Sequence, residues 1–127
     1  MQYEKTVISC PMKGRSEAQI RTTMTQLHKI AEAVFGEELE VLDTYIQDAP
    51  PSTNNEALWH LGESIKKLSE ADCFVGVYDD EREFNGCYIE NQTAKAYGIP
   101  SYAVNLSFVA PDIIAERKAL ARKYQLY

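Results

Sequence analysis

Residues 72–78, DCFVGVY, decide the fold of this chain of 127 residues. The run is almost continuously apolar, which is typical of a central strand that is covered on both faces. Shorter runs predict three further strands, at residues 5–10, 39–43 and 101–105. Helical patterns lie between and after the strands, at residues 17–35, 56–70, 86–97 and 111–124. This alternation predicts a single α/β domain over residues 1–127, with a parallel sheet of four to five strands and helices on both faces.

The first two helices carry local signals of their own. Ser16 and Gln19 have the spacing of a capping box, and Gly36 stands where a helix C-cap belongs. Apolar residues recur at helical spacing in both segments, at Ile20, Met24, Leu27, Ala31 and Val34 and then at Leu58, Leu61, Ile65 and Leu68. We expect these two faces to pack against the sheet.

The composition excludes several classes of function. There are 13 basic and 19 acidic residues, a net charge of −6, so we expect no nucleic-acid polymer as a partner. The sequence has no apolar run of about 20 residues and no signal-peptide pattern, which predicts no membrane association. Cys10, Cys73 and Cys87 form no CxxC motif, so we expect free thiols and a cytoplasmic location. No histidine or cysteine pattern indicates a metal site.

In a parallel α/β sheet, ligands bind beyond the carboxyl ends of the strands. The segment Ser9-Cys10-Pro11-Met12-Lys13-Gly14-Arg15 follows the first strand. Gly14 permits a tight turn, and the helix start together with Lys13 or Arg15 can hold an anion. The loop is neither GxGxxG nor a P-loop, and an ordinary turn with solvated basic residues is the alternative.

Carboxylates lie near the same edge. Glu90 falls about one turn into the third helix, where it can act as a nucleophile, as a base or as a partner for sugar hydroxyls. The alternative is a glutamate that only stabilises the helix N-terminus. Asp79, Asp80, Glu81 and Glu83 form an acidic loop that can supply an acid or hold a divalent cation, and a solvated loop is the alternative.

Four stretches together resemble the nucleoside 2-deoxyribosyltransferase-like superfamily, specifically its small bacterial and phage proteins with an IS-x-PM-x-G start. They are VISCPMKGR, VLDTYIQDAP, LWHLGESIKKLSEADCFV and GCYIENQTAKAYGIP, which fall within about residues 5–105. The last helix lies outside the resemblance. The resemblance implies a flavodoxin-like (Rossmannoid) fold and cleavage or transfer at the bond between a (deoxy)ribose and its base.

Site residues follow from the resemblance. Glu90 matches the family's nucleophile in the segment that begins at Gly86. The loop from Ser9 to Arg15 would hold the sugar 5′ end or its phosphate. Ser64 stands where the deoxyribosyltransferases carry an aspartate, with Glu63 beside it, and Phe84 and Asn85 stand where the hydrolases carry a serine.

Further roles complete this interpretation. Ser64 and one of Asp79 or Asp80 are candidates for orienting the sugar or protonating the base. Trp59, Tyr45 and Phe84 can stack on the base. The implied partner is a small-molecule nucleoside or nucleotide, with no cofactor and no metal. Relatives assemble, so we expect a homodimer or higher homo-oligomer, with residues 110–127 as a possible contact.

Two other hypotheses remain open. The chain can be a non-catalytic protein that binds a nucleotide or nucleotide signal on the same scaffold, as the missing aspartate at Ser64 favours. It can also be an interaction protein whose site is vestigial.

Overall fold

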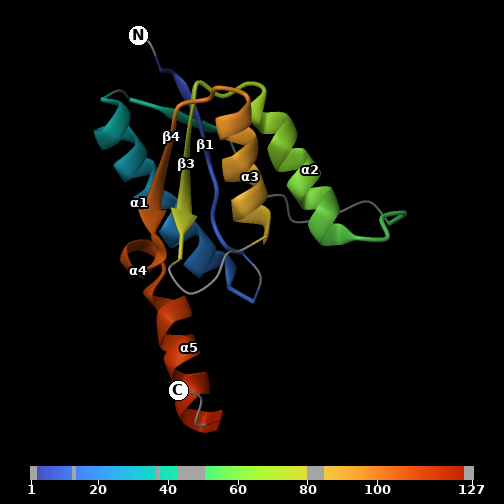
Figure 1. Cartoon of the computed structure of the whole chain (residues 1–127), viewed down its shortest axis with the longest axis vertical. Helices are drawn as coiled ribbons and strands as arrows, with labels where there is room; N and C mark the ends of the chain where they lie inside the picture. The colour runs from blue at the N-terminus through green and yellow to red at the C-terminus, as the bar shows by residue number, and fades with distance from the viewer. Residues whose placement is uncertain (1–2, 13, 37, 43–50, 80–84, 125–127) are drawn as a thin grey trace.

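Four parallel strands form one sheet in the order β2-β1-β3-β4 in this computed structural model (Figure 1). The structure describes residues 3–12, 14–36, 38–42, 51–79 and 85–124. The elements are β1 (Lys5–Ile8), α1 (Glu17–Phe35), β2 (Glu40–Leu42), α2 (Glu56–Leu68), β3 (Cys73–Tyr78), α3 (Asn85–Ala96), β4 (Ser101–Asn105), α4 (Leu106–Val109) and α5 (Pro111–Tyr124). The predicted α/β, flavodoxin-like fold is confirmed, with every predicted element present and its ends within two residues of the prediction.

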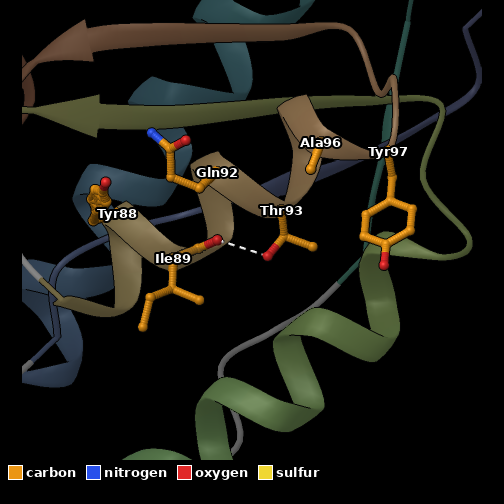
Figure 2. Close-up of a pocket in the computed structure, with 6 residues that line it drawn as sticks. All are labelled: Tyr88, Ile89, Gln92, Thr93, Ala96 and Tyr97. Carbon is orange, nitrogen blue, oxygen red and sulfur yellow. Dashed lines mark hydrogen bonds between the residues drawn. The ribbon is translucent and has the colours of Figure 1, made fainter.

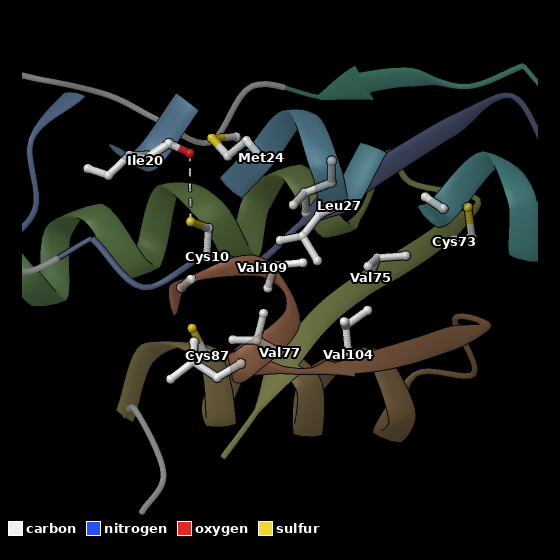
Figure 3. Close-up of a cluster of buried hydrophobic side chains, with 14 of the residues drawn as sticks. Cys10, Ile20, Met24, Leu27, Cys73, Val75, Val77, Cys87, Val104 and Val109 are labelled. Carbon is white, nitrogen blue, oxygen red and sulfur yellow. Dashed lines mark hydrogen bonds between the residues drawn. The ribbon is translucent and has the colours of Figure 1, made fainter. Parts of the chain in front are cut away.

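Helices cover both faces of the sheet. Neighbouring residues of a strand point to opposite faces, so Val7 and Ile8 enter different cores, as do Phe74 and Val75. The larger core contains Ile8 and Val75 with Leu27 of α1 (Figure 3). The smaller core, under α2 and α3, contains Val7, Phe74, Leu68 and Ala94. The central run DCFVGVY is therefore buried on both sides, as its composition predicts.

The ends of α1 follow the local signals. The Ser16 side chain accepts from the Gln19 N–H, the Gln19 side chain accepts from the Ser16 N–H, and Gly36 closes the helix with φ of 72°. Each of the two predicted apolar faces includes one residue that the structure leaves exposed. Val34 is 44% exposed and Leu58 is 63% exposed, because each lies near a helix end that extends past the sheet-facing part of the helix.

One helix was not predicted. The single turn α4 begins directly after β4, with Asn105 as its N-cap. Leu106 and Val109 of this turn are buried in the core on the α1 side. The turn redirects the chain into α5, which extends away from the sheet at the end to which the strands point (Figure 1).

The order of the strands fixes the place of a site. The chain runs from β1 to the edge strand β2 and then crosses to β3 on the other side of β1. The topological switch point therefore lies between β1 and β3, beyond Ile8 and Tyr78, and this is where open α/β sheets bind ligands. The Ser9 N–H donates to the Val75 carbonyl at 2.8 Å, which keeps the chain after β1 beside β3 at this point.

Candidate active site

Ser9 and Glu90 meet at the switch point. Ser9 follows β1, and Glu90 lies in the second turn of α3, whose first turn begins at the same end of the sheet (Figure 1). The Ser9 hydroxyl donates to Glu90 Oε1 at 3.1 Å. Both residues are almost fully buried, at 1% and 8% exposure. Two side chains separated by 81 positions in sequence are thus joined in a polar contact beneath the surface.

The Glu90 carboxyl has an unusual protonation equilibrium. Burial raises its pKa to about 7, because removal from water penalises the charged form, and the hydrogen bond from Ser9 opposes this rise only in part. At neutral pH the acid and the carboxylate are therefore present in comparable amounts. Such a group can attack an electrophilic carbon as a carboxylate or donate a proton as an acid. A glutamate that only stabilises a helix N-terminus would keep its charge more easily if it were exposed to water, as Glu56 is at the start of α2.

Thiols contribute to the low polarity around this carboxylate. Cys10 and Cys87 are both buried and interact electrostatically with Glu90. Burial raises the pKa of Cys10 to about 11 and that of Cys87 to about 12. Both thiols are neutral at pH 7, so they act as small packed groups and not as nucleophiles. The three cysteines are free, as predicted.

The loop after Ser9 reaches the site but turns inward. Pro11 is buried and Met12 packs against the larger core. The Arg15 N–H donates to the Met12 carbonyl at 3.1 Å, and Gly14 takes φ of 75° inside this turn. The tight turn expected at Gly14 is thereby confirmed. Lys13 lies outside the described residues.

The structure corrects the prediction that Arg15 is available to a phosphate. Its side chain is 4% exposed, and the guanidinium binds Asp112 through two hydrogen bonds, of 2.9 and 3.0 Å. It also donates to the Pro11 carbonyl at 2.9 Å and to the Thr23 hydroxyl at 2.7 Å. The Ser16 and Gln19 N–H groups are used in the capping box. The described donors of Arg15, Ser16 and Gln19 are therefore bound within the protein, and this loop shapes the edge of the site.

Asp79 is paired in a similar way. Its carboxylate accepts from Arg117 of α5 at 2.6 and 3.3 Å and is 6% exposed. Asp79 is a predicted candidate for orienting the sugar, but in the structure both of its carboxylate oxygens bind a guanidinium. Asp80, Glu81, Glu83 and Phe84 lie outside the described residues, as does Tyr45.

The remaining candidates lie on α2 and α3. Ser64 is buried on α2, which packs against α3. Trp59 is half-buried in the first turn of α2, where its ring meets that of His60 edge-on at 5.1 Å. Gly86 is half-buried in the first turn of α3, four residues before Glu90. The structure brings Ser9 into contact with Glu90, and these three residues stay candidates by their position at the same edge.

An open groove of about 490 Å³ lies on the outer face of α3 (Figure 2). Its lining is Tyr88, Ile89, Gln92, Thr93, Ala96 and Tyr97. Glu90 is absent from this lining, because it points from the same helix into the protein. The groove is therefore a separate surface from the buried carboxylate.

No sequence motif singles out three residues that shape this site. Asp112 and Arg117 bind the two loops from a helix that has no motif. Gly76 of β3 faces Ser9, and a Cβ added there would lie 3.7 Å from the Ser9 Cβ and 3.0 Å from the Phe74 ring. A glycine within an otherwise apolar strand was the available signal, since it often marks a close approach of another group.

The described part of the chain contains neither a cluster of metal ligands nor a helix that could span a membrane. Within it, no three His, Cys, Asp or Glu side chains lie close enough together to hold a metal ion. Of the helices described, none is both long and apolar enough to cross a membrane.

No known family matches the chain, and no curated protein is significantly similar to it.

Proposed function

We propose that this protein cleaves or transfers the N-glycosidic bond of a (deoxy)nucleoside or nucleoside 5′-monophosphate, with Glu90 as the nucleophile. The observation that carries the proposal is the buried Glu90 carboxyl at the switch point, held by the Ser9 hydroxyl at 3.1 Å. The resemblance of the segments around Ser9 and Glu90 to the nucleoside 2-deoxyribosyltransferase-like superfamily supports the substrate class.

The chemistry requires little more than this pair. Ser9 holds Oε1, so the other carboxylate oxygen attacks the anomeric carbon of the sugar. The bond from that carbon to the base nitrogen breaks, and the nitrogen takes the electron pair and then a proton. Water, or the nitrogen of a second base, attacks the glycosyl ester and releases Glu90 as a carboxylate. Neither a metal nor an organic cofactor enters these steps.

The test is a base-release assay on ribo- and deoxyribonucleosides and their 5′-monophosphates, with and without an acceptor base. We expect release or exchange in the wild type and a loss of at least about 1,000-fold in Glu90→Ala. Glu56→Gln is the matched control, because it removes an exposed carboxylate from a helix start. Equal turnover in wild type and Glu90→Ala would contradict the proposal.

The second candidate is a protein that binds a nucleotide without turnover. Ser64 favours it, since a buried serine cannot replace the aspartate that is thought to handle the proton of the base in the deoxyribosyltransferases. In that case Glu90 accepts hydrogen bonds from ribose hydroxyls. Thermal shift with the same nucleotides separates the two candidates: a binder shows a shift that weakens in Glu90→Ala, with no released base in any sample.

Assembly and location belong to the same proposal. We expect a homodimer or higher homo-oligomer in the cytoplasm, with α5 as a contact, and the 47% exposure of Leu120 on this helix supports that role. Light scattering after size exclusion is the test. A monomer at micromolar concentration would contradict the assembly.

A further inference from the structure

The C-terminal helix α5 reaches both described strand ends at the switch point. Asp112 in its first turn binds Arg15 of the loop after β1, and Arg117 one turn later binds Asp79 directly after β3. We call these two contacts the α5 ion pairs. This helix lies outside the segments on which the proposed function draws, so its role is argued from its contacts alone.

The first pair leads to the reacting carboxyl through a short series of contacts. Asp112 binds the Arg15 guanidinium through both oxygens, at 2.9 and 3.0 Å. Arg15 Nη1 donates to the Pro11 carbonyl at 2.9 Å, two residues beyond Ser9. Ser9 then donates to Glu90. The Arg15 side chain thus fixes the backbone beside the residue that holds Glu90.

The second pair acts on the other strand of the switch point. Asp79 follows Tyr78, the last residue of β3, and its carboxylate is 6% exposed in the contact with Arg117. β3 neighbours β1 in the sheet, and the Ser9 N–H bonds to the Val75 carbonyl of β3. A fixed end of β3 therefore restricts the position of Ser9 from the opposite side.

Burial separates these contacts from ordinary surface pairs. Exposed ion pairs hold their side chains weakly because water competes for both partners. Arg15 is 4% exposed and Asp79 is 6% exposed, and each makes two hydrogen bonds to its partner. Much of the rest of α5 lies in solvent, including Glu116 and Lys118. The described contacts of the helix are thus concentrated where it meets the site.

We propose that Asp112 and Arg117 are positioning residues, through which α5 fixes the backbone on both sides of the switch point and so maintains the contact between Ser9 and Glu90. Their importance for turnover rests on the proposed function of Glu90. The effect of these two residues on the backbone at the switch point can be measured without any substrate.

Hydrogen exchange of backbone amides measures how firmly the backbone is held at the switch point. We expect Asp112→Asn to accelerate exchange by about 10-fold or more at the amides of residues 9–12, which are those of Ser9, Cys10 and Met12, with the central amides of Phe74 and Val75 unchanged. Arg117→Gln should do the same at residues 77–79, and Arg117→Lys should restore part of the protection. Glu116→Gln is the control, because this exposed residue lies on the same helix outside both pairs.

A double-mutant cycle tests the connection to Ser9. If Asp112 maintains the contact between Ser9 and Glu90, Ser9→Ala will lower the free energy of unfolding less in an Asp112→Asn background than in the wild type. Full additivity, together with unchanged exchange at residues 9–12, would overturn the proposal. If Asp112→Asn does not fold, exchange at residues 9–12 and 77–79 in Arg117→Gln and Arg117→Lys decides it.

The outcomes for the two proposals are distinct. If the wild type releases no base but the α5 variants accelerate exchange locally, the proposed function fails and the positioning role stands. If base release depends on Glu90 while the α5 variants exchange like the wild type, the positioning role fails and the proposed function stands.

Discussion

Two acidic side chains at the same edge of the sheet are held in opposite ways. Asp112 meets a buried guanidinium and binds it through both oxygens. Glu90 is buried whereas Asp112 is only half-buried, yet a neutral hydroxyl holds Glu90. The paired aspartate stabilises the fold, whereas the glutamate is kept at the expense of stability. That difference makes Glu90, and not Asp112, the candidate for the proposed chemistry.

Removal of the cation at Arg15 should have the largest effect on stability. Arg15→Met leaves the Asp112 carboxylate, the Thr23 hydroxyl and the Pro11 carbonyl without their donor. Breaking a fully buried pair in this way costs about 3–5 kcal/mol, and we expect the lower end of that range because the Asp112 side chain is 30% exposed. Urea denaturation at pH 7 measures this change in the free energy of unfolding, with Lys29→Met as a control, because Lys29 is an exposed cation of the neighbouring helix α1. A cost under about 1 kcal/mol would mean that the pair behaves like a surface contact.

Neutralisation of Glu90 should instead raise the free energy of unfolding. The folded-state pKa of Glu90 is about 7 and that of a free glutamate is 4.5, so the native state binds more protons than the unfolded state between these values. The wild type therefore loses stability from this group as pH rises through that window. The Glu90→Gln side chain does not ionise, so this variant keeps the stability that the wild type loses as pH rises. We expect it to be more stable than wild type by about 3 kcal/mol at pH 8 and by under about 1 kcal/mol at pH 5.

Denaturant titration at the two pH values checks this sign. Glu56→Gln serves again as the control, because an exposed glutamate should give no difference between pH 5 and pH 8. A destabilised Glu90→Gln protein at pH 8 would show that the carboxylate has a structural partner and would remove the contrast with Asp112.

The sequence predicted the fold because its signals are local. The capping box at Ser16, the αL glycine at Gly36 and the apolar run at residues 72–78 each act within a few residues. The site depends on contacts between residues that are far apart in sequence. Arg15 and Asp112 are 97 positions apart, and nothing near either residue specifies the other. Motif and helix position could therefore mark Glu90 and Ser9 as candidates, but only the packed structure shows which charged neighbours are committed to partners.

Gly76 illustrates a signal that was present in the sequence but not used. Gly76→Ala places a methyl group 3.0 Å from the Phe74 ring and 3.7 Å from the Ser9 Cβ. Overpacking of this kind costs about 1–3 kcal/mol. Gly62→Ala is the matched control, since a Cβ meets nothing within 4 Å there and alanine favours the helix by about 0.5–1 kcal/mol. Thermal denaturation of both variants should give shifts of opposite sign, and equal shifts would contradict the close contact between Gly76 and the Phe74 ring.

Ser9→Ala should have the smallest effect on stability and the most specific effect on the carboxyl. It removes one buried hydrogen bond, worth about 1 kcal/mol. The same bond lowers the pKa of Glu90 against the larger effect of burial, so its loss raises that pKa further above 7.

A nucleophile must be ionised, so the rate of base release in wild type should increase with pH through about 7. In Ser9→Ala this rise should begin at higher pH, which lowers the rate several-fold at pH 7 and less at pH 9. Ser107→Ala, at an exposed serine, is the control and should follow the wild-type profile. A profile that falls as pH rises through 7 would instead assign Glu90 the role of a proton donor, because the acid would then be the active form.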